Sequence, residues 1–176
     1  PSPGGPSRSF AEQSVCRLLG VVREFPIQGQ NVRSGSWSRR AFPRVMGTTL
    51  GIVGVGRVGQ AGATRARGLG MNVVAFDPFA NKEFAAEWQI EIVSLDDLYA
   101  RSEYVSLHSP STPETFQMIN KESLAKMKSG AILINTARGS LIKEDDWLES
   151  LRSGHLRGAA LDVLALEPLP PSTRLV

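Results

Sequence analysis

The chain has 176 residues, of which 41% are hydrophobic, so it is long enough to bury the core of one domain. Its net charge of +3 is small, and its basic residues are not interleaved with aromatic ones as a nucleic-acid surface requires. No apolar run approaches the ~18 residues of a membrane span, nothing resembles a signal peptide, and the single cysteine excludes an internal disulfide. We therefore expect a cytoplasmic protein with no metal site and no nucleic-acid or membrane partner.

The N-terminal part predicts one helix ahead of the domain core. Residues 1–9 are rich in Pro, Gly and Ser and are expected to be a disordered lead-in. Residues 10–25 carry apolar side chains at helical spacing and are followed by Pro26, which predicts an amphipathic helix ending there. Cys16 within it is expected to be buried. A polar connection then leads to a first strand near Leu50, and residues 10–176 are expected to form one domain.

The most specific motif surrounds this first strand. Residues 49–59 read TLGIVGVGRVG, an apolar run that leads into three glycines with the spacing G-x-G-x-x-G. This pattern is typical of a strand, a phosphate-binding turn and a helix. Gly54 would allow the sharp turn, Gly56 would let the backbone approach a pyrophosphate, and Gly59 would let the helix pack closely on the strand. The unpaired N–H groups at the helix N-terminus favour a bound phosphate.

A second apolar run, residues 73–76, ends at Asp77. At the carboxyl end of a second strand, this carboxylate would accept hydrogen bonds from the adenosine ribose hydroxyls, which favours NAD over NADP. Strand, turn, helix, strand and acid in this order predict a dinucleotide site. The alternative is a structural turn followed by a strand-end Asp.

The rest of the chain alternates strands and helices. Further strands are expected at residues 91–93, 104–107, 131–135 and 159–163, and helices at 96–100, 121–127 and 144–152. Continuous apolar strands separated by helices indicate a parallel sheet covered on both faces. The sequence therefore predicts a doubly wound (Rossmann) α/β fold with a six-stranded parallel sheet, and a cofactor lying across the carboxyl ends of the strands.

Five segments in a fixed order carry a resemblance to a known family. They are Arg33-x-Gly35-x-Trp37, residues 49–59, Leu107-His108-x-Pro110-x-Thr112-Pro113-Glu114-Thr115, Asn135-Thr136-Ala137-Arg138-Gly139, and residues 158–163 with Glu167-Pro168. From about Phe10 onward, the chain resembles the coenzyme-binding domain of the D-isomer-specific 2-hydroxyacid dehydrogenases. This family includes phosphoglycerate, glycerate and D-lactate dehydrogenases and the C-terminal binding protein corepressors.

The resemblance implies roles for individual residues. Arg138 matches the arginine that clamps the substrate carboxylate and polarises the 2-keto oxygen, and Glu167 matches the acid that orients the catalytic histidine. Asp162 matches a residue beside the nicotinamide carboxamide. The complete implied NAD-binding set is Gly54, Gly56, Arg57, Val58, Gly59, Asp77, His108, Pro110, Thr115, Thr136, Ala137 and Asp162. From the residues alone, Arg138 could instead be a helix cap or a surface ion-pair residue, and Glu167 a solvated turn residue.

The sequence departs from the family pattern in three places. In the family pattern, the catalytic histidine lies further beyond the Glu-Pro pair than Val176, so we expect this chain to lack it. We likewise expect the chain to lack the substrate-binding domain. Lys143 stands where an Asp usually begins a helix. His108 matches a cofactor-side position, and His155 matches nothing catalytic. We therefore expect a truncated dehydrogenase acting on a small 2-keto or 2-hydroxy acid, incomplete for catalysis by itself.

Two alternative functions stay open at this point. One is a free-standing NAD(H)-binding sensor or scaffold, and the other is a different Rossmann enzyme, such as a relative of S-adenosylhomocysteine hydrolase. The spacing of Arg138 and Glu167 favours the dehydrogenase and the sensor over a different Rossmann enzyme. We also expect a homodimer, because the apolar stripe of residues 10–25 lacks a substrate domain to cover it and coenzyme domains pair in the family.

Overall fold

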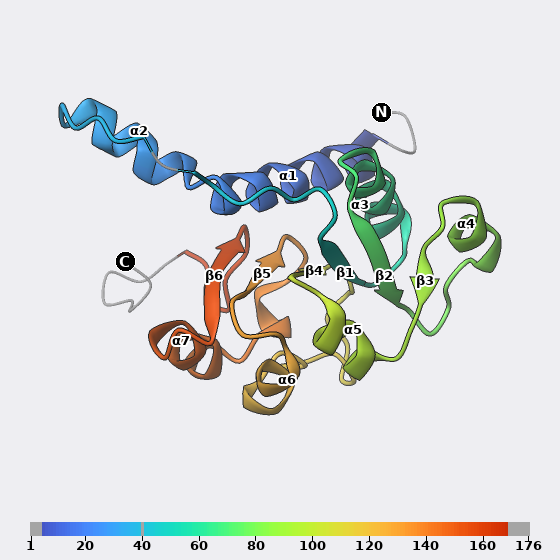
Figure 1. The fold of residues 1–176 in the computed structure, drawn as a ribbon. Helices are drawn as coiled ribbons and strands as arrows, with labels where there is room; N and C mark the ends of the chain where they lie inside the picture. Colours follow the sequence, from blue (N-terminus) through green and yellow to red (C-terminus); the bar gives the residue numbers. More distant parts are fainter. Residues whose placement is uncertain (1–4, 40, 169–176) are drawn as a thin grey trace.

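In the computed structural model, which describes residues 5–39 and 41–168, six strands form a single sheet (Figure 1). Neighbouring strands are all parallel, and their order is β3-β2-β1-β4-β5-β6. The strands are β1 (Thr49–Val53), β2 (Asn72–Phe76), β3 (Glu91–Ile92), β4 (Tyr104–Leu107), β5 (Ala131–Asn135) and β6 (Leu156–Leu161). The two halves run outward from β1 and β4, which confirms the predicted doubly wound fold.

Helices cover both faces of the sheet. On one face lie α1 (Gly5–Val22) and α3 (Arg57–Gly68), and on the other lie α5 (Leu95–Arg101), α6 (Lys121–Lys126) and α7 (Glu144–Arg152) (Figure 1). A short helix, α4 (Lys82–Glu87), lies beside β3, and a 3₁₀ turn (Gly139–Leu141) follows β5. The core is therefore two apolar layers, one on each side of the sheet. All residues of β4 and β5 are buried, including the polar Ser106 and Asn135, and this burial explains why the other residues of both strands are apolar.

The N-terminal region differs from the sequence prediction. Helix α1 begins at Gly5, so residues 5–9 are helical where a disordered lead-in was expected, and residues 1–4 lie outside the described part. The helix predicted over residues 10–25 is two helices, because α1 ends at Val22 and α2 (Phe25–Arg33) follows a left-handed Glu24. Pro26 does not stop a helix here. It occupies the first turn of α2, where a missing N–H costs no helical hydrogen bond.

Helix α2 projects from the body of the domain, beyond the end of α1 (Figure 1). None of its residues is buried. Cys16 on α1 is exposed, not buried as expected, because the helix turns Ala11, Leu18 and Val22 toward the sheet instead.

The remaining elements lie close to their predicted positions. Strand β6 begins at Leu156 and ends at Leu161, earlier than the predicted 159–163, whereas α4 and the 3₁₀ turn after β5 were not predicted. No helix in the described ranges combines the length and apolar character that a membrane crossing requires.

Candidate cofactor and active site

The glycine-rich turn joins the carboxyl end of β1 to α3, at the point where the strand order reverses. Gly54 has φ +96°, and a Cβ there would lie 2.9 Å from the His108 carbonyl carbon. At Gly59, a Cβ would lie 2.0 Å from the Gly54 oxygen, so α3 approaches the turn as closely as glycine permits. Gly56 is different, because a Cβ there would meet no protein atom within 4 Å. The fold therefore requires glycine at positions 54 and 59. The open space beside Gly56 leaves its backbone accessible to a ligand.

The N-terminus of α3 points outward from this turn. Gly56 is its N-cap residue, no side chain caps the first N–H groups, and the first turn contains no acidic residue. Arg57 is exposed and Val58 is half-buried at the same place. Uncapped N–H groups and the positive end of the helix dipole make this terminus suited to an anionic group such as a pyrophosphate.

Asp77 lies at the end of β2, directly beside the glycine-rich turn. One carboxylate oxygen, Oδ2, accepts a hydrogen bond of 2.7 Å from the Val55 N–H, and Oδ1 accepts one of 2.8 Å from the Phe79 N–H. The carboxylate therefore fixes the turn to the end of β2, a role that the sequence did not indicate. Each oxygen keeps further acceptor capacity, which ribose hydroxyls could use.

The loop after β4 holds two predicted cofactor residues together. The Thr115 hydroxyl donates to the Pro110 carbonyl over 2.7 Å and accepts from the Thr112 N–H over 2.8 Å. These bonds close residues 110–115 into a compact turn at the carboxyl edge of the sheet. Hydrogen bonds within the loop therefore hold the Thr115 side chain and the Pro110 backbone in place at this edge.

His108 has its backbone at this edge but its imidazole elsewhere. Nε2 lies 2.9 Å from the Ser106 hydroxyl, on the side of the sheet that α1 and α3 cover. Burial lowers the pKa of His108 to about 4, so the ring is neutral at pH 7. Only the backbone of His108 borders the glycine-rich turn, where it packs against Gly54.

The loop after β5 presents Arg138. Asn135, which is fully buried at the end of the strand, donates from Nδ2 to the Arg138 carbonyl over 2.8 Å and accepts from the Ala137 N–H over 3.0 Å. Both ends of one carboxamide thus hold the loop, and the Arg138 side chain is exposed. Sequence reasoning assigned no role to Asn135, although a polar residue that ends an apolar strand was a signal. Thr136 turns inward, and its hydroxyl lies 2.7 Å from that of Ser14 on α1.

The loops after β5 and β6 meet directly. A Cβ on Gly139 would lie 2.0 Å from the carbonyl carbon of Leu164, so only glycine allows this approach. Glu167 then folds back, and its Oε1 accepts a hydrogen bond of 2.7 Å from the Leu164 N–H. Arg138 and Glu167, 29 residues apart in the numbering, are therefore carried by loops in backbone contact.

Asp162 follows β6 at the same edge and is held by α1. Its Oδ1 accepts hydrogen bonds from the Arg17 guanidinium and, over 3.2 Å, from the Gln13 amide. Arg17 and Gln13 were not among the predicted site residues, because nothing in the sequence shows that α1 crosses the ends of β5 and β6. Within the described ranges, no group of three or more His, Cys, Asp or Glu is arranged to hold a metal ion.

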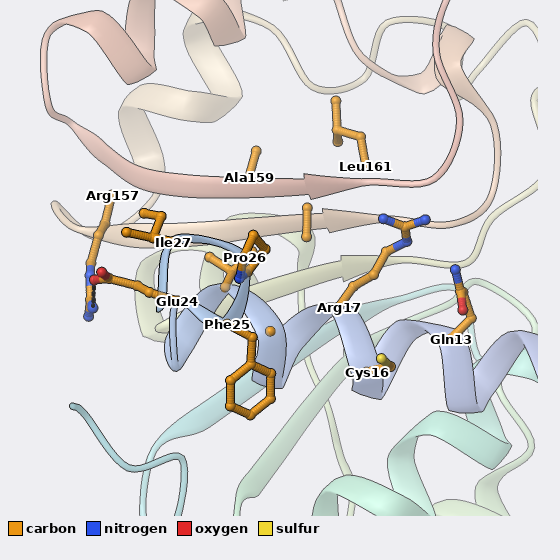
Figure 2. A pocket seen from close by; sticks show the side chains of 13 residues that line it. Gln13, Cys16, Arg17, Glu24, Phe25, Pro26, Ile27, Arg157, Ala159 and Leu161 are labelled. Atoms are coloured by element: carbon orange, nitrogen blue, oxygen red, sulfur yellow. Dashed lines mark ion pairs between the residues drawn. The ribbon is translucent and has the colours of Figure 1, made fainter. Parts of the chain in front are cut away.

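A separate groove of about 740 Å³ lies between α1, the start of α2 and β6 (Figure 2). Arg17 and Gln13 lie at its end beside Leu161, and Glu24 and Arg157 form an ion pair at the opposite end. The glycine-rich turn does not line this groove.

A doubly wound sheet with a glycine-rich turn at its switch point, and an acid at the end of the next strand, defines a dinucleotide-binding domain. The sequence model described as "D-isomer specific 2-hydroxyacid dehydrogenase, NAD binding domain" matches residues 15–176. The chain belongs to this family and forms its NAD-binding domain.

Individual relatives agree with this assignment. The chain is 43% identical over 166 residues to D-3-phosphoglycerate dehydrogenase of Mycobacterium bovis and 40% identical over 177 residues to that of Bacillus subtilis. These matches cover 93% and 99% of this chain, but only 31% and 34% of the relatives. The chain therefore spans about a third of the length of these relatives.

Solved structures show the same domain. D-lactate dehydrogenase of Aquifex aeolicus, complexed with NAD and lactic acid, superposes with a TM-score of 0.87 at 32% identity, covering 90% of this chain and 48% of that one. D-lactate dehydrogenase of Salmonella has a TM-score of 0.86 at 31% identity, covering 89% and 48%. The predicted family, fold and cofactor are thereby confirmed.

Proposed function

We propose that this domain supplies the NAD(H) site and half of the catalytic groups of a dehydrogenase that transfers a hydride between NAD(H) and a D-2-hydroxy acid or its 2-keto acid. The observation that carries the proposal is the backbone contact between Gly139 and Leu164, which joins the Arg138 loop to the Glu167 loop. The exposed Arg138 guanidinium would grip the substrate carboxylate in a bidentate manner and polarise the keto oxygen. Glu167 would orient the imidazole of a histidine and raise its pKa.

The cofactor would lie along the carboxyl edge of the sheet. Its pyrophosphate would meet the N-terminus of α3 beside Gly56, and its adenosine ribose would meet Asp77. The nicotinamide would then reach the ends of β5 and β6, beside Ala137 and Asp162. When bound, NADH supplies the hydride, and the residues of this chain hold the cofactor and the substrate carboxylate.

Binding of oxamate, an unreactive isostere of pyruvate, tests the role of Arg138. Calorimetric titration of the NADH-loaded protein should give saturable binding. Arg138→Ala should weaken it by about 10- to 100-fold, since charge-assisted hydrogen bonds contribute about 1.5–3 kcal/mol. Arg152→Ala, a change to an exposed arginine at the end of α7, serves as the control. Equal oxamate affinity in wild type and Arg138→Ala would contradict the proposal.

We further propose a homodimer, for a reason that differs from the predicted one. The apolar side of α1 is covered by the sheet, but α2 and the segment after it expose large apolar side chains. Their exposed fractions are 58% for Phe25, 51% for Ile27, 57% for Val32 and 77% for Trp37. Large apolar side chains exposed together on a projecting helix mark a surface that binds another protein chain. Sedimentation at tens of micromolar should give a dimer, and the double change Phe25→Ser with Trp37→Ser should give monomers.

We place the protein in the cytoplasm as part of the same proposal. A nicotinamide cofactor and a single exposed thiol are typical of a reducing compartment. Fractionation of the source cells would test this location directly.

A further inference from the structure

The middle of α1 contacts Asp162 through a charge that the proposed reaction does not use. The Arg17 guanidinium forms an ion pair with Oδ1 of Asp162, and the Gln13 amide donates to the same oxygen over 3.2 Å. In Figure 2, both side chains leave the same side of α1 and reach toward the end of β6 at Leu161. Within the described residues, Oδ2 of Asp162 has no hydrogen-bond partner.

Two other contacts hold this arrangement at the carboxyl edge. The Asp162 N–H donates to the Asn135 carbonyl over 2.9 Å, which fixes Asp162 beside the Arg138 loop. The Ser14 hydroxyl meets that of Thr136 at 2.7 Å in a buried position, which fixes α1 to the end of β5. Because Arg17 lies about one helical turn after Ser14, it faces the end of the neighbouring strand β6. The ion pair is therefore held by α1, β5 and β6 together.

The side chains are about 30% exposed, so their charges are only partly screened by solvent. The Nε of Arg17 is buried without a hydrogen-bond partner, and its terminal Nη2 meets the carboxylate. An isolated Asp162 would put one negative charge at the end of β6. The pair with Arg17 brings the local net charge to zero.

From this we propose that Arg17 is a positioning residue that sets which oxidation state of the cofactor the site prefers. The inference rests on the proposed location of the nicotinamide beside Asp162. The nicotinamide ring is positively charged in NAD⁺ and neutral in NADH. A bare Asp162 carboxylate would attract the oxidised ring, whereas the adjacent guanidinium cancels that attraction. Arg17 therefore shifts the preference toward NADH while leaving Oδ2 free to accept a hydrogen bond from the carboxamide.

Three ligands separate this effect from a general loss of structure. Dissociation constants for NAD⁺, NADH and ADP-ribose, which has no nicotinamide, are measured by calorimetry on the wild type and on Arg17→Gln. Glutamine keeps an N–H donor but removes the charge. We expect the ratio of the NAD⁺ to the NADH dissociation constant to fall roughly fivefold, as one partly screened charge predicts. The affinity for ADP-ribose should stay within about twofold, because that ligand does not reach Asp162.

Two further variants complete the test. Arg17→Lys keeps the charge and should retain the wild-type ratio. Arg65→Gln removes an arginine that pairs with Glu12 across α1 and α3, and should also leave the ratio unchanged. An unchanged ratio in Arg17→Gln, or an equal loss of affinity for all three ligands, would overturn the inference.

Asp162→Asn distinguishes failure of this inference from failure of the proposed cofactor site. Removing the carboxylate should raise the ratio, which is the opposite direction to Arg17→Gln. If Asp162→Asn shifts the ratio and Arg17→Gln does not, only the role of Arg17 is wrong. If Asp162→Asn leaves the ratio unchanged, the nicotinamide does not lie beside Asp162, and both proposals fall.

Discussion

The hydroxyl groups of Ser14 and Thr136 lie 2.7 Å apart in a buried contact, although 122 residues separate them in the sequence. The Ser14 hydroxyl also lies 2.9 Å from the Phe10 carbonyl and donates to it. Thr136 must then donate to Ser14, so the pair forms a chain of two hydrogen bonds with a fixed direction. This contact ties the N-terminal helix to the loop that presents Arg138.

We expect Ser14→Ala to lower the free energy of unfolding by about 1–3 kcal/mol, because the buried Thr136 hydroxyl loses its acceptor. The double change Ser14→Ala with Thr136→Val should cost less than the sum of the single changes, since both polar groups are then gone. Urea unfolding of the four proteins measures this coupling. Strict additivity would show that the two hydroxyls do not interact.

The glycines of the turn should separate stability from cofactor binding. Gly59→Ala places a methyl group against the Gly54 oxygen and should lower the free energy of unfolding by about 1–3 kcal/mol. Gly56→Ala meets no protein atom, so it should leave the melting temperature nearly unchanged while weakening NAD⁺ binding. Thermal unfolding and calorimetry on both variants check this. Full NAD⁺ affinity in Gly56→Ala would contradict close approach of a pyrophosphate.

Asp77 should make the domain prefer NAD(H) over NADP(H). A 2′-phosphate at this position would meet a carboxylate, and the residues that follow, Pro78 and Phe79, offer no positive charge. Asp77→Ala should narrow the gap between the two cofactors. It should also weaken the binding of NAD⁺, because the Val55 and Phe79 N–H groups lose the acceptor that holds the turn to the end of β2. Equal or tighter NADP(H) binding by the wild type would contradict the assignment.

His108 should make stability depend on pH below neutrality. Burial lowers its pKa to about 4 in the folded protein, against about 6.5 in the unfolded chain. Between these values the unfolded state binds more protons, so stability is fully present above pH 6.5 and is lost as the pH falls toward 4. The loss should total at most about 3 kcal/mol. Unfolding curves measured from pH 4 to 8 should show this dependence of the unfolding free energy on pH in the wild type and in His155→Gln. The dependence should be weaker in His108→Gln.

The 176-residue chain by itself should reduce 2-keto acids only at background rates. Neither histidine reaches Arg138, because the His108 ring faces α1 and α3, and His155 Nε2 lies 2.9 Å from the Leu124 carbonyl at the opposite edge of the sheet. A positioned general acid contributes about 10²–10⁴-fold to such a reaction. NADH oxidation with glyoxylate, pyruvate and hydroxypyruvate measures the rate. Clear turnover that Arg138→Ala abolishes would mean that another group supplies the proton.

Local sequence determined most of the fold. Strands β4 and β5 and helix α7 have the predicted bounds because their signals are local. These signals are largely apolar runs for the strands, and for the helix Gly154, which has φ +76° just beyond its end. The glycine spacing likewise predicted which positions of the turn cannot hold a side chain, and Gly54 and Gly59 bear this out.

Tertiary contacts decided the rest. Strand β6 starts at Leu156 because it pairs with β5 from Ala131 onward, and pairing partners are not visible in a local pattern. The sequence pattern predicted that a helix ends at Pro26, but a proline fits the first turn of a helix equally well, and Pro26 lies in the first turn of α2. The side-chain partners of His108, Thr136 and Asp162 depend on which helix crosses the ends of their strands. The sequence determined that these residues lie at the carboxyl edge, and only the packing of α1 on the sheet decided which groups they contact.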